Sequence, residues 1–144
     1  MNLEQILNEL LADLNVFYRK LQNYHWNVEG KDFFTTHAKL EEIYNEVNTS
    51  IDEIAEHILI LGGQPLGTLK DYLNITCIQE AENQKIKSEE IYKNLINDFQ
   101  SLLKKTIQIK EQAESQKDYA TSSLIDAYIL QYGKYIWMLK HTIA

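Results

Sequence analysis

The chain contains very few residues that interrupt helices. Its 144 residues include one proline and five glycines, and most of these lie at Gly30 or within residues 62–67. Proline and glycine are the residues that most often end or break a helix. Long helices joined by a small number of links are therefore predicted, and with them an all-α fold.

Apolar residues recur at alternating spacings of three and four through most of the chain, which is the period of an amphipathic helix. The strongest repeat begins after Asp32, a suitable N-cap residue, and stops at Gly62. Asp118 suits the N-cap of the last helix, and no alternating strand pattern is found. The expected helices cover residues 2–28, 32–61, 83–116 and 118–141.

The connection between the second and third expected helices is long, from residue 64 to residue 82. Structureless connections of that length are unusual in a compact domain, so a short helix around residues 68–73 is expected within it. Two short links and one long crossover between four helices are typical of a ferritin-like four-helix bundle. The length suits a single domain over residues 1–144.

Composition narrows the class of protein further. Apolar residues make up 44% of the chain, and no apolar run approaches the roughly 18 residues of a membrane span. The N-terminal residues form no basic signal segment, so a cytoplasmic location is expected. Cys77 is the single cysteine and cannot form an internal disulfide, which agrees with a reducing compartment. We interpret Cys77 as structural.

The net charge is −7, and the acidic surplus lies in the first half of the chain. Residues 1–65 hold 4 Lys and Arg against 11 Asp and Glu, whereas residues 66–144 hold 10 of each kind. The affinity of proteins for nucleic acid comes largely from Lys and Arg contacts to phosphates. The charge therefore disfavours nucleic acid as a partner and favours cations.

Five side chains that can bind a metal ion lie within 32 residues, namely His25, His37, Glu41, Asp52 and Glu56. The last four form two pairs spaced i, i+4 on the second expected helix, so the members of each pair share a helical face. Imidazole and carboxylate ligands together suit iron, manganese or zinc, and a site with open positions suits redox-active Fe(II). Paired acidic residues are also typical of a plain solvated face, and a histidine on an apolar stripe can be a satisfied core residue.

The length of the second helix separates these two pairs. At about 1.5 Å per residue, Glu41 and Asp52 lie roughly 16 Å apart along the axis, too far to share one ion through bonds of about 2.0–2.2 Å. Each pair is therefore half of a site. A second copy of the helix, antiparallel about a two-fold axis near residues 46–47, would bring each half beside its complement. His57 points away from this flank of the helix and is expected at the surface.

Four motifs in the first half of the chain are more specific. They read NYHWNV at residues 23–28, FFxxH at 33–37, EEIYNE at 41–46 and IDEIAE at 51–56. Together they resemble the Dps mini-ferritin family, named for the DNA-binding protein from starved cells, and the likeness extends over nearly the whole chain. The resemblance implies a hollow homododecamer of four-helix subunits, each with a short extra helix in the crossover between the second and third helices.

The resemblance also implies a chemistry. It indicates a ferroxidase that oxidises Fe(II), with hydrogen peroxide as the favoured oxidant, and stores ferric oxide inside the shell, which protects against oxidative damage. Trp26 is a candidate electron donor, with interface packing as the alternative. The ligands of the implied di-iron centre are His25, His37 and Glu41 from one subunit and Asp52 and Glu56 from its partner.

Two other functions stay open at this point. One is a non-enzymatic DNA-compacting shell, although the Lys-rich tail with which many family members bind DNA is absent from both ends of this sequence. The other is a plain helical interaction module, which would require the ligand spacing to be accidental. No Glu-x-x-His sequence occurs, so the di-iron centre that ferritins build within one bundle is excluded.

Overall fold

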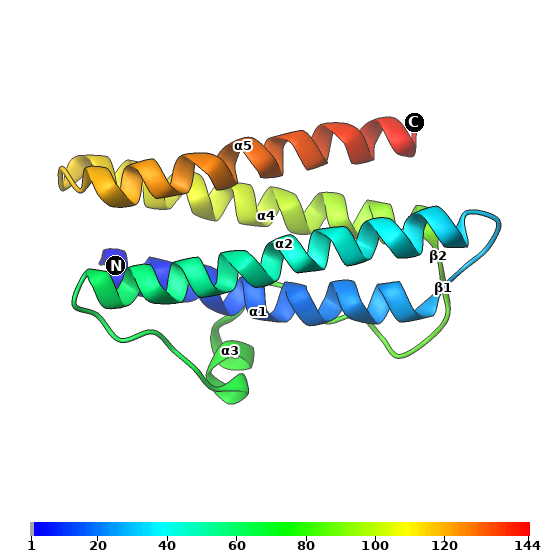
Figure 1. Cartoon of the computed structure of the whole chain (residues 1–144), viewed down its shortest axis with the longest axis horizontal. Coiled ribbons are helices and arrows are strands. Elements are labelled where there is room, and N and C mark those ends of the chain that lie inside the picture. Colours follow the sequence, from blue (N-terminus) through cyan, green and yellow to red (C-terminus); the bar gives the residue numbers. More distant parts are fainter. Residues whose placement is uncertain (1) are drawn as a thin grey trace.

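Among residues 2–144, which the computed structural model describes, five helices make up most of the chain (Figure 1). The helices are α1 (Leu3–Asn27), α2 (Phe33–Ile60), α3 (Leu69–Ile75), α4 (Ser88–Ser115) and α5 (Tyr119–Thr142), and the strands are β1 (Val28–Glu29) and β2 (Ile86–Lys87). The long amphipathic helices predicted from the apolar repeat are confirmed.

The four long helices form a bundle built from two antiparallel hairpins. Helices α1 and α2 lie side by side, as do α4 and α5, and α1 also packs against α4 (Figure 1). The crossover from α2 to α4 carries α3, which lies against α1 at the lower edge of the view. This arrangement confirms the ferritin-like four-helix bundle with a short extra helix in the long crossover.

A pair of two-residue strands, which the sequence pattern does not predict, ties the α1–α2 link to the start of α4. Val28 pairs with Ile86 and Glu29 pairs with Lys87 in a parallel register. Because residues 86–87 are extended, α4 begins at Ser88, and the start expected at residue 83 is wrong. The pairing joins segments far apart in the sequence, so the local apolar period carries no sign of it.

The helix starts follow largely from capping. The side chain of Asn2 caps α1 by accepting a hydrogen bond from a backbone N–H in the first turn. Asp118 caps α5 as predicted, and its carboxylate accepts from the backbone N–H of Thr121 at 3.1 Å. Asp32 occupies the N-cap position of α2 without a capping hydrogen bond. Its carboxylate accepts instead from the hydroxyl of Ser88, and this contact joins the two hairpins.

Two tyrosine–glutamate hydrogen bonds fix which face of α2 is turned toward α5. Tyr128 and Tyr135 of α5 donate to Glu53 and Glu46 of α2, respectively. Burial and these carboxylates raise the pKa of both tyrosines, so the hydroxyls stay protonated and remain donors. With this face held against α5, the adjoining flank of α2, which carries the candidate carboxylate ligands, stays exposed.

The buried carboxylate of Asp13 anchors the crossover to α1. It accepts from the Thr76 hydroxyl and from the Cys77 backbone N–H, each at 2.8 Å. Burial raises the pKa of Asp13 in spite of these hydrogen bonds. The Cys77 side chain is exposed. The structural role expected for this residue therefore rests on its backbone and not on its thiol.

The core is formed by apolar side chains from all four long helices. Ile107 of α4 is an exception among the apolar residues of that helix, because its side chain is 41% exposed. In the part of the chain that the structure describes, residues 2–144, no helix combines the length and apolar character that crossing a membrane requires.

Candidate metal centre

The last turn of α1 and the first turns of α2 bring His25 and His37 into contact. The link between these helices is short because Gly30 adopts a φ of 133°, which residues with a side chain rarely adopt. The two imidazole rings stack with centroids 3.6 Å apart and planes inclined by 12°. The spacing of the two histidines in the sequence does not predict this contact. It depends on the way α1 and α2 pack as a hairpin, which the structure shows.

Hydrogen bonding orients both rings. The Nδ1 atom of His25 lies 2.7 Å from the carbonyl oxygen of His37, and the Nδ1 atom of His37 lies 2.7 Å from the carbonyl oxygen of His25. A carbonyl oxygen can only accept, so each Nδ1 carries the proton. In the neutral form, each Nε2 is then left with a free lone pair. This tautomer is the one that a metal-binding histidine with a backbone partner adopts.

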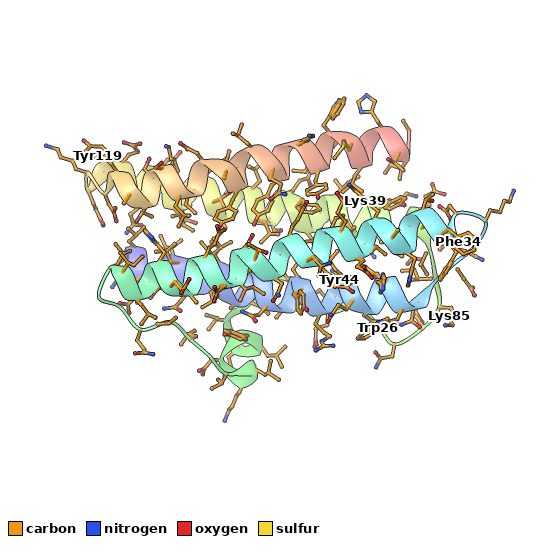
Figure 2. The ribbon with its side chains drawn as sticks, in the orientation of Figure 1. Trp26, Phe34, Lys39, Tyr44, Lys85 and Tyr119 are labelled. Atoms are coloured by element: carbon orange, nitrogen blue, oxygen red, sulfur yellow. The ribbon has the colours of Figure 1, made fainter. Side chains whose placement is uncertain are left out.

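Two further aromatic rings bracket the imidazole pair. Phe33 stacks on His37 with centroids 4.9 Å apart and an angle of 21°. Tyr44 meets His25 edge to face, with centroids 5.3 Å apart and an angle of 85°, and makes a similar contact with Tyr18 on its other side. Figure 2 places Tyr44 on the α1–α2 hairpin. The histidines are therefore held in a packed aromatic row.

Glu41 lies beside this row. Its Oε1 atom is 3.6 Å from the Nε2 atom of His25, while its side chain is 55% exposed. Partial burial and the nearby charge of Glu41 raise the pKa of the Tyr44 hydroxyl. Glu41 thus lies near His25, which in turn stacks on His37.

Asp52 and Glu56 lie farther along the same helix, and both are exposed. Asp52 lines a shallow depression on the surface of α2, formed with Asn48, Thr49, Ile51, Glu53 and Ala55. Because α2 is one uninterrupted helix, the separation of roughly 16 Å between Asp52 and Glu41 holds in the fold. Within residues 2–144 of one chain, no three His, Cys, Asp or Glu side chains are grouped closely enough to hold a metal ion.

Trp26 lies on the outer side of α1, toward its C-terminal end (Figure 2). Its side chain is 55% exposed, and the guanidinium of Arg19 lies 5.8 Å from the centre of its ring. The tryptophan is thus adjacent to His25 in sequence but is not part of the aromatic row.

His57 is buried, so its expected surface position is wrong. Its Nε2 atom lies 2.7 Å from the hydroxyl oxygen of Thr121, and that hydroxyl donates to Asp118 at 2.6 Å. The Thr121 oxygen must therefore accept from His57. The sequence pattern of α2 could not show this, because the cover over His57 comes from the start of α5. The contact of Tyr44 with His25 was not predicted either, although Tyr44 lies one turn after Glu41 on α2.

Comparison with known proteins identifies the family to which the chain belongs. The ferritin-like domain family matches residues 4–144. The DNA protection during starvation protein 2 of Bacillus anthracis is 40% identical over 136 residues, which cover 94% of this chain and 92% of that protein. The chain belongs to the Dps mini-ferritin family. The resemblance noted in its motifs is thereby confirmed.

Solved structures of Dps proteins show the same fold. The Dps protein of Bacillus brevis superposes with a TM-score of 0.95 at 36% identity, covering 99% of this chain and 95% of that one. The Dps protein of Vibrio cholerae O1 superposes with a TM-score of 0.95 at 39% identity, covering 99% and 89%. The latter is described as a member of a broad superfamily of ferritin-like diiron-carboxylate proteins.

Proposed function

We propose that this Dps-family chain is a ferroxidase and iron-storage protein. It oxidises Fe(II) with hydrogen peroxide and keeps the ferric oxide inside a homododecameric shell, which protects the cell against oxidative damage. The observation that carries this proposal is the reciprocal hydrogen bonding of His25 and His37, which leaves the Nε2 lone pair of each neutral ring free, with the Glu41 carboxylate 3.6 Å from Nε2 of His25. Family membership supports the same reading, because a diiron-carboxylate relative shares the fold.

The centre is a di-iron site shared between two subunits. His25, His37 and Glu41 of one subunit form the first half, and the partner subunit's Asp52 and Glu56 form the second. The distance along α2 supports sharing, because one helix cannot bring both halves to the same ions. The exposure of Glu41, Asp52 and Glu56 supports it as well, since a partner helix could reach all three.

The reaction couples two iron ions to one oxidant. Each Fe(II) loses one electron, and one hydrogen peroxide molecule takes up both electrons and two protons to give two water molecules. Because both electrons arrive together, no hydroxyl radical is released. Carboxylate and imidazole ligands would bind the iron, and remaining open positions would admit peroxide. We place this reaction in the cytoplasm, in line with the single free cysteine.

We further propose that Trp26 donates electrons when the iron supply at a site is incomplete. Its position next to His25 in the chain supports this role, whereas its half-exposed ring under Arg19 would equally suit contact with a partner subunit. Replacement by Phe separates the two readings. Loss of a tryptophan radical signal with an unchanged oligomer favours donation, and loss of the oligomer favours packing.

A subunit-mixing experiment tests the shared centre. His37→Ala damages the first half of the site and Asp52→Ala damages the second, so each pure oligomer should lose most of its Fe(II) oxidation. In a mixed dimer, one site receives both intact halves and the other receives both damaged halves. Unfolding and reassembling an equal mixture should therefore restore about a quarter of the wild-type rate.

The matched control places both lesions in the same half. A mixture of His37→Ala and Glu41→Ala chains contains no intact first half in any mixed site, so it should stay inactive. Mass measurement of the particles establishes that both chains are present. Reassembled His37→Ala and Asp52→Ala particles that contain both chains, yet oxidise iron no faster than their parents, would show that the centre is not shared.

A further inference from the structure

Tyr135 of α5 combines a buried aromatic ring with a proton acceptor. Its side chain is only 7% exposed, and its hydroxyl donates to the Glu46 carboxylate of α2 at 2.5 Å, a length typical of a hydrogen bond to a charged oxygen. The Gln131 side-chain amide donates to the same carboxylate oxygen at 2.8 Å and helps to hold it in place. A phenol that loses an electron becomes a strong acid. Here the group that would take its proton is already bonded to it.

The surroundings of the Tyr135 ring favour losing the proton together with the electron. The Lys39 ammonium lies 5.7 Å from the centre of the ring, and a positive charge there opposes a radical that keeps its proton and is itself cationic. Phe99 stacks on the ring with centroids 5.0 Å apart and planes inclined by 17°, so the ring is packed into the core. A neutral tyrosyl radical, its proton moved to Glu46, is therefore the oxidised form that this environment accepts.

Tyr132, one turn earlier on α5, has the same burial without the acceptor. Its side chain is 3% exposed, and its ring centroid lies 5.7 Å from that of Phe99. Its hydroxyl has no hydrogen-bond partner among residues 2–144, which the structure describes. Oxidation of Tyr132 would therefore leave a charged group in the core with nothing to take the proton. The two tyrosines share a helix and a neighbouring ring, and they differ in the proton acceptor.

A small surface cavity lies over the pair of Tyr135 and Glu46. Its volume is about 150 Å³, and both members of the pair line it together with other side chains of α2 and α5. A space of this size admits water and oxidants as small as hydroxyl radical. The similar pair of Tyr128 and Glu53 does not line this cavity. Tyr135 is therefore buried against the core and still within reach of a small oxidant.

We propose that Tyr135 is a radical trap that reduces one-electron oxidants, with Glu46 as the base that takes its proton. The oxidant is hydroxyl radical, which Fe(II) forms when it reduces peroxide by one electron. Tyr135 gives one electron to the radical, which becomes hydroxide, while the phenol proton passes to Glu46 and then to the hydroxide to form water. Tyr135 is left as a neutral tyrosyl radical, which one Fe(II) ion and one proton convert back to tyrosine. This activity goes beyond the proposed function, because no step uses the shared iron centre.

The test uses the full-length, iron-free oligomer and a ruthenium(III) oxidant generated by a light flash, so its result does not depend on ferroxidase activity. Electron paramagnetic resonance of protein grown with ring-deuterated tyrosine separates tyrosyl from tryptophan radicals. We expect the wild type to accumulate a tyrosyl radical and Tyr135→Phe to lose most of that signal. Tyr132→Phe is the matched control, and it should keep the signal. Glu46→Gln keeps the tyrosine but cannot take the proton, so the radical should form about 100-fold more slowly.

Several outcomes would overturn the proposal. The wild type could form no tyrosyl radical, or the signal could survive Tyr135→Phe and disappear in Tyr132→Phe or Tyr128→Phe, and either result would show that Tyr135 is not the trap. An unchanged rate in assembled Glu46→Gln would show that Glu46 is not the base. A wild-type oligomer that forms the radical as described but does not oxidise Fe(II) would contradict the proposed function and leave the radical trap standing.

Discussion

The imidazoles of His25 and His37 lie 3.6 Å apart and exchange hydrogen bonds, each Nδ1 reaching the backbone carbonyl of the other residue at 2.7 Å. His25 is in the last turn of α1, where carbonyl oxygens lack partners within the helix. The His37 ring supplies one of these missing donors. The same contacts that complete the helix end thus orient two candidate ligands.

This coupling makes the two histidines act as a unit. His25→Ala and His37→Ala should each abolish most peroxide-dependent Fe(II) oxidation, and the double variant should lose little more than either single one. Initial rates for the four proteins, measured at equal iron loading, give the comparison. Rate losses that multiply in the double variant would show that the two rings contribute independently.

His57 should matter for stability and not for oxidation. Its Nε2–H donates to Thr121, and His57→Leu would leave that buried hydroxyl oxygen without this donor, which should cost about 1–3 kcal/mol of unfolding free energy. His57→Gln can still donate and should cost less. Denaturant unfolding at a fixed subunit concentration measures both. A strong loss of ferroxidase activity in a folded His57→Gln oligomer would mean that His57 belongs to the site.

Asp13 should give the folded chain a distinct pH dependence. Burial raises its pKa above 3.8 in the folded state. At a pH below the pKa of Asp13 in the unfolded state, the carboxyl group is protonated in both states and does not change the free energy of unfolding with pH. As the pH rises, Asp13 ionises first in the unfolded state. The free energy of unfolding therefore falls until the pH exceeds the pKa of Asp13 in the folded state. Asp13→Asn keeps an acceptor for Thr76 and removes the charge, so its stability relative to the wild type should increase over that interval. Parallel pH profiles for the two proteins would contradict this.

DNA should not be retarded by this protein at neutral pH and physiological salt. Twelve chains of charge −7 would give a shell of about −84, and phosphate would be repelled. Gel mobility of duplex DNA with increasing protein measures this. A variant with an added Lys-rich N-terminal tail is the positive control, and it should bind in a salt-dependent way. Salt-sensitive retardation by the unmodified chain would revive the DNA-compacting alternative.

Several features of this protein could be predicted from the sequence because they depend on local geometry. The helical period needs only neighbouring residues, so the four long helices and the short helix near residue 70 were predicted. The pairing of His37 with Glu41 and of Asp52 with Glu56 follows from one helical turn. The separation of the two pairs follows from the rise of the helix.

The remaining features required the packing of distant segments. The start of α4 depends on the pairing of β1 with β2, and the burial of His57 depends on Thr121 at the start of α5. The tautomers of the histidine pair depend on carbonyl groups that meet only when α1 and α2 form a hairpin. The contact of the Tyr44 ring with His25 depends on the same hairpin. A periodic pattern specifies which face of a helix is buried, whereas only the tertiary structure decides which groups that face and its flanks will meet.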